Sequence, residues 1–158
     1  MGYRHIDTAQ IYGNEADVGK AVRDSGIPRG EIFITTKLWL TNGGASKTRM
    51  AVQESIRKLQ THIDLILLHA PGNAILRAET WAALESLYNE GIVNNIGVSN
   101  FGIPHLEKLK KTAKVMPSVN QIELHPWLQR TDLVTYCKDN GIVVQVLYTV
   151  YSVFVLNR

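Results

Sequence analysis

Cysteine is almost absent from this chain of 158 residues, in which Cys137 is the only one. A single thiol cannot form a disulfide within the chain, and it cannot supply the paired thiolates of a structural zinc site. The five histidines show no zinc-like pairing either, so we expect no bound metal. The sequence also lacks a charged leader before an apolar segment and an N-x-Ser/Thr acceptor, so we expect a cytoplasmic protein.

Long hydrophobic runs and a strong charge of one sign are missing as well. The apolar tail 141–156 is shorter than the about 18 residues of a membrane-spanning helix and contains Gln145, so we expect no membrane span. The net charge is +3, but basic residues are mixed with acidic ones. Their one dense cluster, 108–114, is typical of a solvated helix face, so we expect no nucleic-acid partner.

Short β-branched runs alternate with segments whose apolar residues recur every three or four positions, which predicts a repeated strand–helix pattern. The expected strands are 3–7, 32–37, 63–68, 95–99, 118–123 and 142–147. Asn14 with Asp17 resembles a capping box, and Ser46 precedes another expected helix. Glycines should end three helices, at Gly26, Gly91 and Gly141. This alternation requires parallel strands joined by right-handed crossovers, in one domain without an internal linker.

The pattern leaves an open doubly wound sheet and a closed (β/α)₈ barrel as candidate architectures. An open dinucleotide-binding sheet needs G-x-G-x-x-G directly after a strand, and the nearest glycine-rich loop, 41–46, does not fit. Polar residues instead end successive expected strands: Asp7, Lys37, His69, Ser99 with Asn100, and Gln121. In a barrel these strand ends meet on one face, where active sites are built. We therefore predict the α/β barrel class.

Three of these polar residues, Asp7, Lys37 and His69, would form a proton-delivering site together with Tyr12 if the four converge. A lysine beside Tyr12 lowers the pKa of the phenol, and Asp7 paired with Lys37 would hold the ammonium charged and oriented. Tyr12 would then act as a general acid, and His69 could donate a hydrogen bond to a carbonyl oxygen. A carbon that receives no nucleophile from the protein needs a hydride from a cofactor. The site therefore suits carbonyl reduction.

The same segments resemble the aldo-keto reductases from Gly2 to about Gln145. The matching segments are GYRHIDTAQIYGNE (2–15), ITTKLW (34–39), DLILLHAP (64–71), GIVNNIGVSNF (91–101) and VNQIELHPW (119–127). The resemblance implies four catalytic residues: Asp7, Tyr12, Lys37 and His69. It also implies that Ser99, Asn100 and Gln121 hold the nicotinamide carboxamide of NADPH, with NADH as the alternative cofactor. Trp39 is expected to form a wall of the substrate pocket.

The resemblance implies an enzyme, an oxidoreductase that reduces an aldehyde or ketone to an alcohol and acts as a monomer when complete. Ala70 departs from the family pattern, because most members of the family carry tryptophan directly after the catalytic histidine, so the substrate pocket is expected to differ there. About six of the eight strand–helix units are expected, in a domain spanning 1–147 that is truncated at both ends. The tail 148–158 does not resemble the family loop that surrounds the pyrophosphate. The alternative is a catalytically inactive fragment or an interaction partner of a full-length relative.

Overall fold

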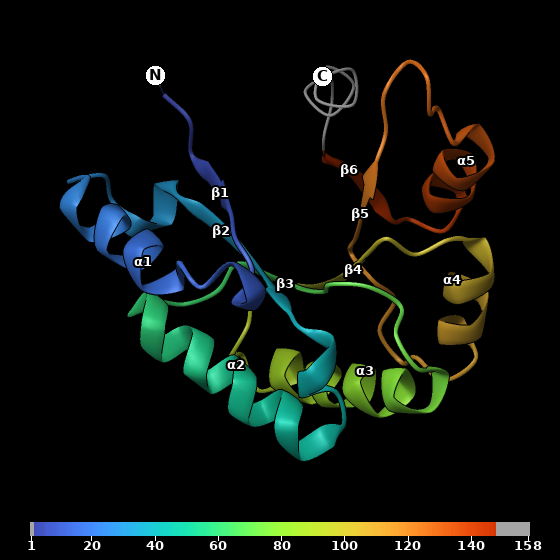
Figure 1. Cartoon of the computed structure of the whole chain (residues 1–158), viewed down its shortest axis with the longest axis horizontal. Helices are drawn as coiled ribbons and strands as arrows, with labels where there is room; N and C mark the ends of the chain where they lie inside the picture. Colours follow the sequence, from blue (N-terminus) through green and yellow to red (C-terminus); the bar gives the residue numbers. More distant parts are fainter. Residues whose placement is uncertain (1, 148–158) are drawn as a thin grey trace, which may run out of the picture.

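The computed structural model describes residues 2–147, which form one curved sheet of six parallel strands with helices on its convex side (Figure 1). The strands are β1 (His5–Asp7), β2 (Phe33–Leu38), β3 (Leu65–Leu68), β4 (Ile96–Ser99), β5 (Val119–Glu123) and β6 (Val143–Leu147). The α-helices are α1 (Glu15–Asp24), α2 (Ala45–Leu59), α3 (Ala74–Asn89), α4 (Ile103–Lys110) and α5 (Thr131–Asp139). Three single-turn 3₁₀ helices complete the described elements: η1 (Gln10–Tyr12), η2 (Arg29–Glu31) and η3 (Leu40–Asn42).

Sequential strand order makes this sheet an arc of a (β/α)₈ barrel, which confirms the predicted fold class with six of its eight strands. Each strand pairs in parallel with the next one along the chain, from β1 to β6. The strands in the middle of the arc are covered on both faces, and every residue of β3 is buried. The predicted strand positions agree with the observed ones to within two residues. The predicted tail 148–158 lies outside the described residues.

The core lies between the sheet and the helices, where the predicted apolar helix faces are buried. In α3, Trp81, Leu84 and Leu87 are almost fully buried, whereas Tyr88 on the same predicted face is 38% exposed. The side chain of Trp81 donates from its indole nitrogen to the carbonyl oxygen of Val115 at 3.0 Å, which satisfies its polar group inside the core. Of the helices that the structure describes, none combines the length and the apolar character needed to cross a membrane.

The helix boundaries confirm part of the sequence prediction and correct the rest. Gly26, Gly91 and Gly141 follow α1, α3 and α5 with φ near +70°, as expected for residues that end helices in the left-handed region. The capping box at Asn14 was wrong, because its Oδ1 atom accepts a hydrogen bond from the Thr8 hydroxyl at 2.6 Å and does not cap α1. Ser46 lies inside α2, not before it, because that helix begins at Ala45.

The two outer strands leave the concave side of the arc open (Figure 1). Within residues 2–147, β1 pairs only with β2 and β6 pairs only with β5. A groove of about 330 Å³ lies where side chains of β1, β2, β3, β5 and β6 come together. Two apolar side chains in this groove are partly in solvent, Phe33 at 38% and Val143 at 62% exposure. The structure therefore presents two sheet edges and an apolar interior that a closed barrel would cover.

Close packing of α1 on α2 leads to the first prediction, that Gly19→Ala destabilises the fold. A Cβ atom at Gly19 would lie 2.1 Å from the carbonyl oxygen of Leu59, which also accepts a hydrogen bond from Arg23 at 3.1 Å. The backbone must shift to relieve this overlap, so we expect a loss of about 1–3 kcal/mol in the free energy of unfolding, measured in urea. Gly30→Ala is the matched control, because no atom lies within 4 Å of its added Cβ. Alanine otherwise favours helices, so an unchanged or raised stability in Gly19→Ala would contradict the packing argument.

Candidate active site

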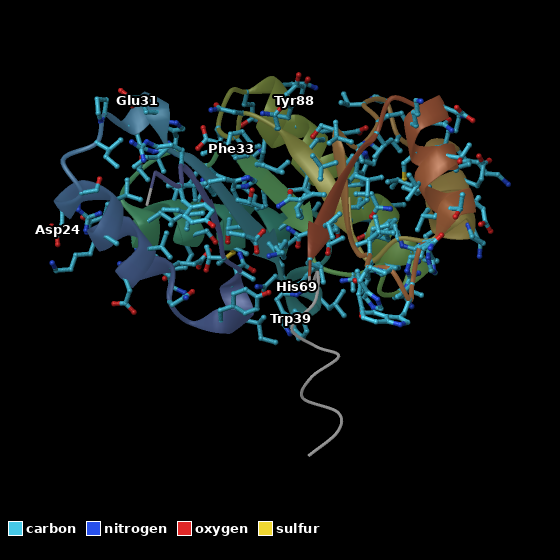
Figure 2. All side chains as sticks on the ribbon, turned by 90° about the horizontal axis from the view of Figure 1, so that it is seen from above. Asp24, Glu31, Phe33, Trp39, His69 and Tyr88 are labelled. Atoms are coloured by element: carbon cyan, nitrogen blue, oxygen red, sulfur yellow. The ribbon has the colours of Figure 1, made fainter. Side chains whose placement is uncertain are left out.

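Parallel pairing brings the predicted polar residues to one end of the sheet. Asp7 ends β1, Ser99 ends β4, and His69 directly follows β3. Ser99 is in register with Gln121 of β5, and Lys37 is in register with Leu67, two residues before His69. Figure 2 shows Trp39 and His69 together at this end of the strands, with Phe33 and Glu31 at the other end. All seven predicted catalytic and cofactor residues therefore lie on or beside the carboxyl-terminal face, where barrel proteins place their sites.

Lys37 and Asp7 form an ion pair at the base of this face. The Lys37 side chain is only 2% exposed and Asp7 is 34% exposed. The ammonium also donates to the carbonyl oxygen of Thr8 at 3.0 Å, and the second carboxylate oxygen of Asp7 accepts from Gln121 Nε2 at 2.7 Å. A buried charge pair persists when further hydrogen bonds satisfy both partners, as they do here. The ion pair thereby joins β1, β2 and β5 around one buried ammonium.

Tyr12 lies over this ammonium, at the last position of η1. The Lys37 Nζ atom is 5.2 Å from the centroid of the Tyr12 ring, within the range of a cation–π contact. The Tyr12 ring is perpendicular to the His69 ring, with 5.9 Å between their centroids. Half of the Tyr12 surface is exposed, so the ring reaches from the buried ion pair to the open face. Gly13 follows with φ +70° and ends the turn that carries the tyrosine.

Gln10 holds this turn in place, and the sequence analysis did not identify it. Its Nε2 atom donates to the carbonyl oxygen of Ala51 at 3.1 Å and to the Ser55 hydroxyl at 3.0 Å. Its Oε1 atom accepts from the backbone nitrogen of Trp39 at 3.0 Å and from Asn42 Nδ2 at 2.8 Å. Four hydrogen bonds therefore tie η1 to α2 and to the loop after β2. The only available signal was the position of Gln10 between Asp7 and Tyr12.

His69 lies between Tyr12 and Trp39 and is held as a neutral imidazole. Its ring is perpendicular to Trp39 at a centroid distance of 5.0 Å. Burial lowers the pKa of His69 below its ordinary 6.5, and the Lys37 ammonium lowers it further, while Asp7 acts in the opposite direction. The buried Nδ1 atom has no hydrogen-bond partner among the described residues. We assign the ring hydrogen to Nε2, because a buried N–H without an acceptor is rare.

These surroundings predict that His69 titrates below pH 6.5 and that Lys37→Met raises its pKa. Removal of the ammonium deletes one of the two causes of the lowered pKa and leaves Asp7, which raises it. The folded state binds this proton less tightly than the unfolded chain, so His69 lowers the stability as the pH falls below 6.5. An NMR titration of the imidazole measures the midpoint directly. Lys58→Met, which changes a lysine on α2 that the His69 shift does not involve, is the control, and an equal shift in both variants would contradict the assignment.

Ser99, Asn100 and Gln121 form a linked group of polar side chains beside His69. The Ser99 hydroxyl donates to the carbonyl oxygen of Gln121 at 3.0 Å and accepts from Asn100 Nδ2 at 3.2 Å. The same Asn100 nitrogen donates to the carbonyl oxygen of His69 at 3.1 Å. Asn100 adopts φ +61°, a left-handed conformation that asparagine tolerates better than most residues. Amide side chains supply both donors and acceptors, which are the groups that a carboxamide needs.

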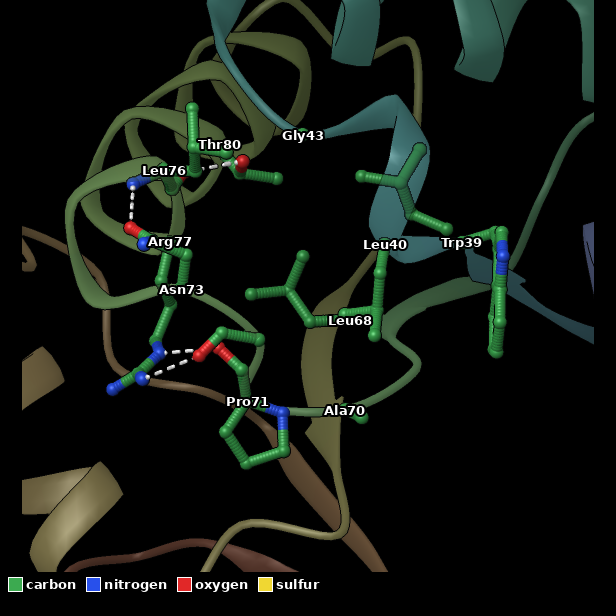
Figure 3. Close-up of a pocket in the computed structure, with 12 residues that line it drawn as sticks. Trp39, Leu40, Gly43, Leu68, Ala70, Pro71, Asn73, Leu76, Arg77 and Thr80 are labelled. Atoms are coloured by element: carbon green, nitrogen blue, oxygen red, sulfur yellow. Dashed lines mark hydrogen bonds between the residues drawn. The ribbon is translucent and has the colours of Figure 1, made fainter.

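A pocket of about 160 Å³, here called the Ala70 pocket, lies between η3, the loop after β3 and the first turns of α3 (Figure 3). Its lining residues are Leu38, Trp39, Leu40, Gly43, Leu68, Ala70, Pro71, Gly72, Asn73, Leu76, Arg77 and Thr80. Trp39 and Ala70, the two residues predicted for the substrate pocket, are both in this lining. Arg77 was not predicted, and it holds the loop after Ala70 by donating to the carbonyl oxygens of Pro71 at 2.6 Å and Gly72 at 3.2 Å.

The fold and the site define a (β/α)-barrel protein. Its strands are parallel, its helices lie outside them, and its polar cluster lies at the carboxyl-terminal face of the sheet. Residues 1–156 match the model of the aldo/keto reductase family, and the chain belongs to that family. The resemblance inferred from the sequence segments is thereby confirmed. The boundary predicted at residue 147 stays a prediction, because the residues beyond it are outside the described part of the chain.

Individual relatives agree with this family. The chain is 47% identical over 145 residues to a glyoxal reductase of Bacillus subtilis, covering 91% of this chain and 52% of that protein. A crystal structure of an aldo/keto reductase from Brucella melitensis superposes with a TM-score of 0.92 at 47% identity, covering 94% of this chain and 59% of that one. A Bombyx mori aldo-keto reductase in complex with NADP superposes with a TM-score of 0.85 at 36% identity, over 92% and 52% of the two chains. The chain thus spans about half the length of the curated relative.

Proposed function

We propose that the protein uses this site to reduce a small aldehyde or ketone to an alcohol, with NADPH as the hydride donor. The observation that carries the proposal is the position of Tyr12 over the buried Lys37 ammonium, with His69 perpendicular to it. Membership of the aldo/keto reductase family and the similarity to a glyoxal reductase support it. We also propose, as expected from the sequence, that the protein is cytoplasmic and monomeric. Gel filtration of the purified protein measures the oligomeric state.

Tyr12 is the proposed general acid. The Lys37 ammonium stabilises the phenolate that remains when Tyr12 gives its proton to the carbonyl oxygen, and Asp7 keeps the ammonium charged and in place. His69 donates from Nε2 to the same carbonyl oxygen and so fixes its position during the transfer. NADPH, when bound, would supply the hydride to the carbonyl carbon. The half-exposed Tyr12 then regains its proton from solvent, and the alcohol leaves.

The polar group around Ser99 fits the nicotinamide carboxamide of this cofactor. Gln121 uses one amide hydrogen on Asp7, and its amide has a second hydrogen and an acceptor oxygen. Asn100 is exposed on the open face, so its amide oxygen can be reached from there. These residues lie next to the ion pair of Lys37 and Asp7, over which Tyr12 lies, because Gln121 contacts Asp7 directly. NADH carries the same carboxamide and is the alternative donor; the relative crystallised with NADP favours the phosphorylated form.

The test of the proposed function is consumption of NADPH by the protein expressed at its full length. Glyoxal, methylglyoxal and a range of larger aldehydes and ketones are offered in turn, and the loss of NADPH absorbance is followed. Reduction of at least one carbonyl, with the matching alcohol identified by mass spectrometry, is the expected result. A folded protein that consumes NADPH with none of these compounds contradicts the proposal.

Loss of the amide side chains is predicted to weaken cofactor binding more than proton transfer. Asn100→Ala and Gln121→Ala each remove neutral hydrogen bonds worth about 0.5–1.5 kcal/mol, so NADPH affinity should fall about 2- to 13-fold. Asn100→Gly keeps the left-handed backbone free of strain and separates that effect from the lost amide. Asn89→Ala, an exposed position at the end of α3, is the control. Unchanged NADPH affinity in both amide variants would count against this site.

The open edges of the sheet favour a second candidate, an inactive fragment or an interaction partner of a full-length relative. Among residues 2–147, the outer edges of β1 and β6 present unpaired backbone groups, which pair readily with strands of another chain. An inactive form would share every contact described above, because none of these contacts depends on turnover. Binding of NADPH by the 158 residues alone separates the two candidates.

A further inference from the structure

Two aromatic rings pack on the His69 imidazole, and each comes from a different loop. Tyr12 ends η1, which follows β1, whereas Trp39 directly precedes η3, after β2 (Figure 3). Both η1 and η3 are 3₁₀ turns of three residues, and among the described residues neither turn has a capping side chain. Turns this short have little stability of their own. The positions of both rings at His69 must therefore be set by contacts from outside the turns.

The side-chain amide of Gln10 supplies contacts to both turns. Its oxygen accepts from the Trp39 backbone nitrogen and from Asn42 Nδ2. Its nitrogen donates to the Ala51 carbonyl oxygen and to the Ser55 hydroxyl, both on α2. A backbone N–H can only donate and a carbonyl oxygen can only accept, so these partners fix the orientation of the amide and use both of its hydrogens. One side chain thereby joins η1 and η3 to α2, which in turn packs against α1 and α3.

We propose that Gln10 is a positioning residue for carbonyl reduction, whose hydrogen bonds hold Tyr12 and Trp39 at His69 in the geometry that proton transfer needs. The inference rests on the proposed function, and Gln10 acts in it through Tyr12, two residues further along η1. The Tyr12 ring must stay over the Lys37 ammonium, now 5.2 Å from its centroid, and a displacement of about 1 Å can lower a rate about 100-fold. The groups proposed to hold the carboxamide lie on and after β4 and on β5, so Gln10 should affect kcat and not cofactor affinity.

The experiment compares two substitutions of Gln10 in the full-length protein. Gln10→Met keeps the length of the side chain and removes all of these hydrogen bonds, so kcat should fall about 10- to 100-fold while NADPH affinity stays near that of the parent. Gln10→Glu keeps an acceptor for Trp39 and loses the bond to Ala51, so its kcat should lie between the two. We expect a loss of about 2- to 13-fold, the range that one neutral hydrogen bond corresponds to. Gln53→Met makes the same change at an exposed position of α2 and is the matched control.

An NMR titration of the His69 imidazole tests the positioning without substrate, and so separates it from the proposed function. Without the bonds of Gln10 both rings can move away and water reaches the imidazole, so the pKa of His69 should rise toward 6.5 in Gln10→Met. It should keep the parent's value in Gln53→Met. Lys37 and Asp7, the charged groups that act on this pKa, are unchanged in both variants. If the full-length parent reduces no carbonyl, the proposed function fails, and the titration alone decides on the positioning.

The two measurements leave clear outcomes for Gln10. A folded Gln10→Met variant with the kcat of the parent, or with an unchanged His69 midpoint, overturns the inference. A parallel loss of kcat and NADPH affinity also overturns it, because that pattern indicates a general disturbance of the fold. If circular dichroism shows that Gln10→Met is unfolded, Gln10→Glu decides: a lower kcat with NADPH affinity kept supports the inference, and a kcat equal to that of the parent overturns it.

Discussion

Tyr12→Phe is expected to abolish carbonyl reduction in the full-length protein while leaving NADPH affinity near normal. The substitution removes only the hydroxyl and keeps the ring over the Lys37 ammonium and perpendicular to His69. Loss of a general acid costs about 10²- to 10⁴-fold in rate, and we expect kcat to fall within that range. Cofactor binding should persist, because the side chains of Ser99, Asn100 and Gln121 are held by hydrogen bonds to one another, to His69 and to Asp7, which the substitution leaves in place.

A matched control for this substitution is Tyr3→Phe, which removes a hydroxyl from a tyrosine that is 85% exposed. Single-turnover rates at saturating NADPH separate the chemical step from product release. The far-ultraviolet circular dichroism of both variants should equal that of the parent, because neither hydroxyl belongs to the core. If Tyr12→Phe turned over within a few-fold of the parent, Tyr12 could not be the acid, and His69 would become the remaining candidate.

The sequence was sufficient to predict the strands and the face on which the polar residues meet. Parallel pairing in sequential order puts the carboxyl ends of all strands on the same side, so residues ending their strands must converge. Asp7 ends β1 and Gln121 lies two residues before the end of β5, and the contact between them joins residues 114 positions apart along the chain. The period of the apolar residues fixes where each strand ends. It is therefore enough to place these groups without knowledge of any loop.

The contacts made by loops could not be predicted in the same way. Gln10 bonds to α2 and to the residues after β2, and these partners become its neighbours only when η1 folds back over the strand ends. Asn14 had the sequence of a helix cap, but Thr8 competes for its side-chain oxygen. The Ala70 pocket likewise depends on how η3 and the loop before α3 pack together. Short polar side chains have several possible backbone partners, and the tertiary structure selects among them.

The open concave side leaves few contacts for the cofactor, so it limits the affinity of these 158 residues for NADPH. Among the described residues, the proposed contacts to NADPH come from the neutral polar group of Ser99, Asn100 and Gln121. Three neutral hydrogen bonds of about 0.5–1.5 kcal/mol each cannot offset an association cost of about 4–15 kcal/mol. The apolar groove around Phe33 and Val143 adds a competing tendency, because exposed edges and apolar surface favour association with other chains.

We therefore expect the 158 residues, expressed alone, to bind NADPH more weakly than about 1 mM, a free energy of about −4 kcal/mol. Fluorescence titration with NADPH measures the affinity, and urea unfolding of the same sample reports whether the chain unfolds cooperatively. The Gln121→Ala variant of the isolated chain is the control, since its affinity should not differ measurably if the amide contacts alone are too weak. Micromolar binding together with a cooperative transition would contradict this expectation. It would mean that the 158 residues fold and hold the cofactor unaided, which would count against the inactive-fragment candidate.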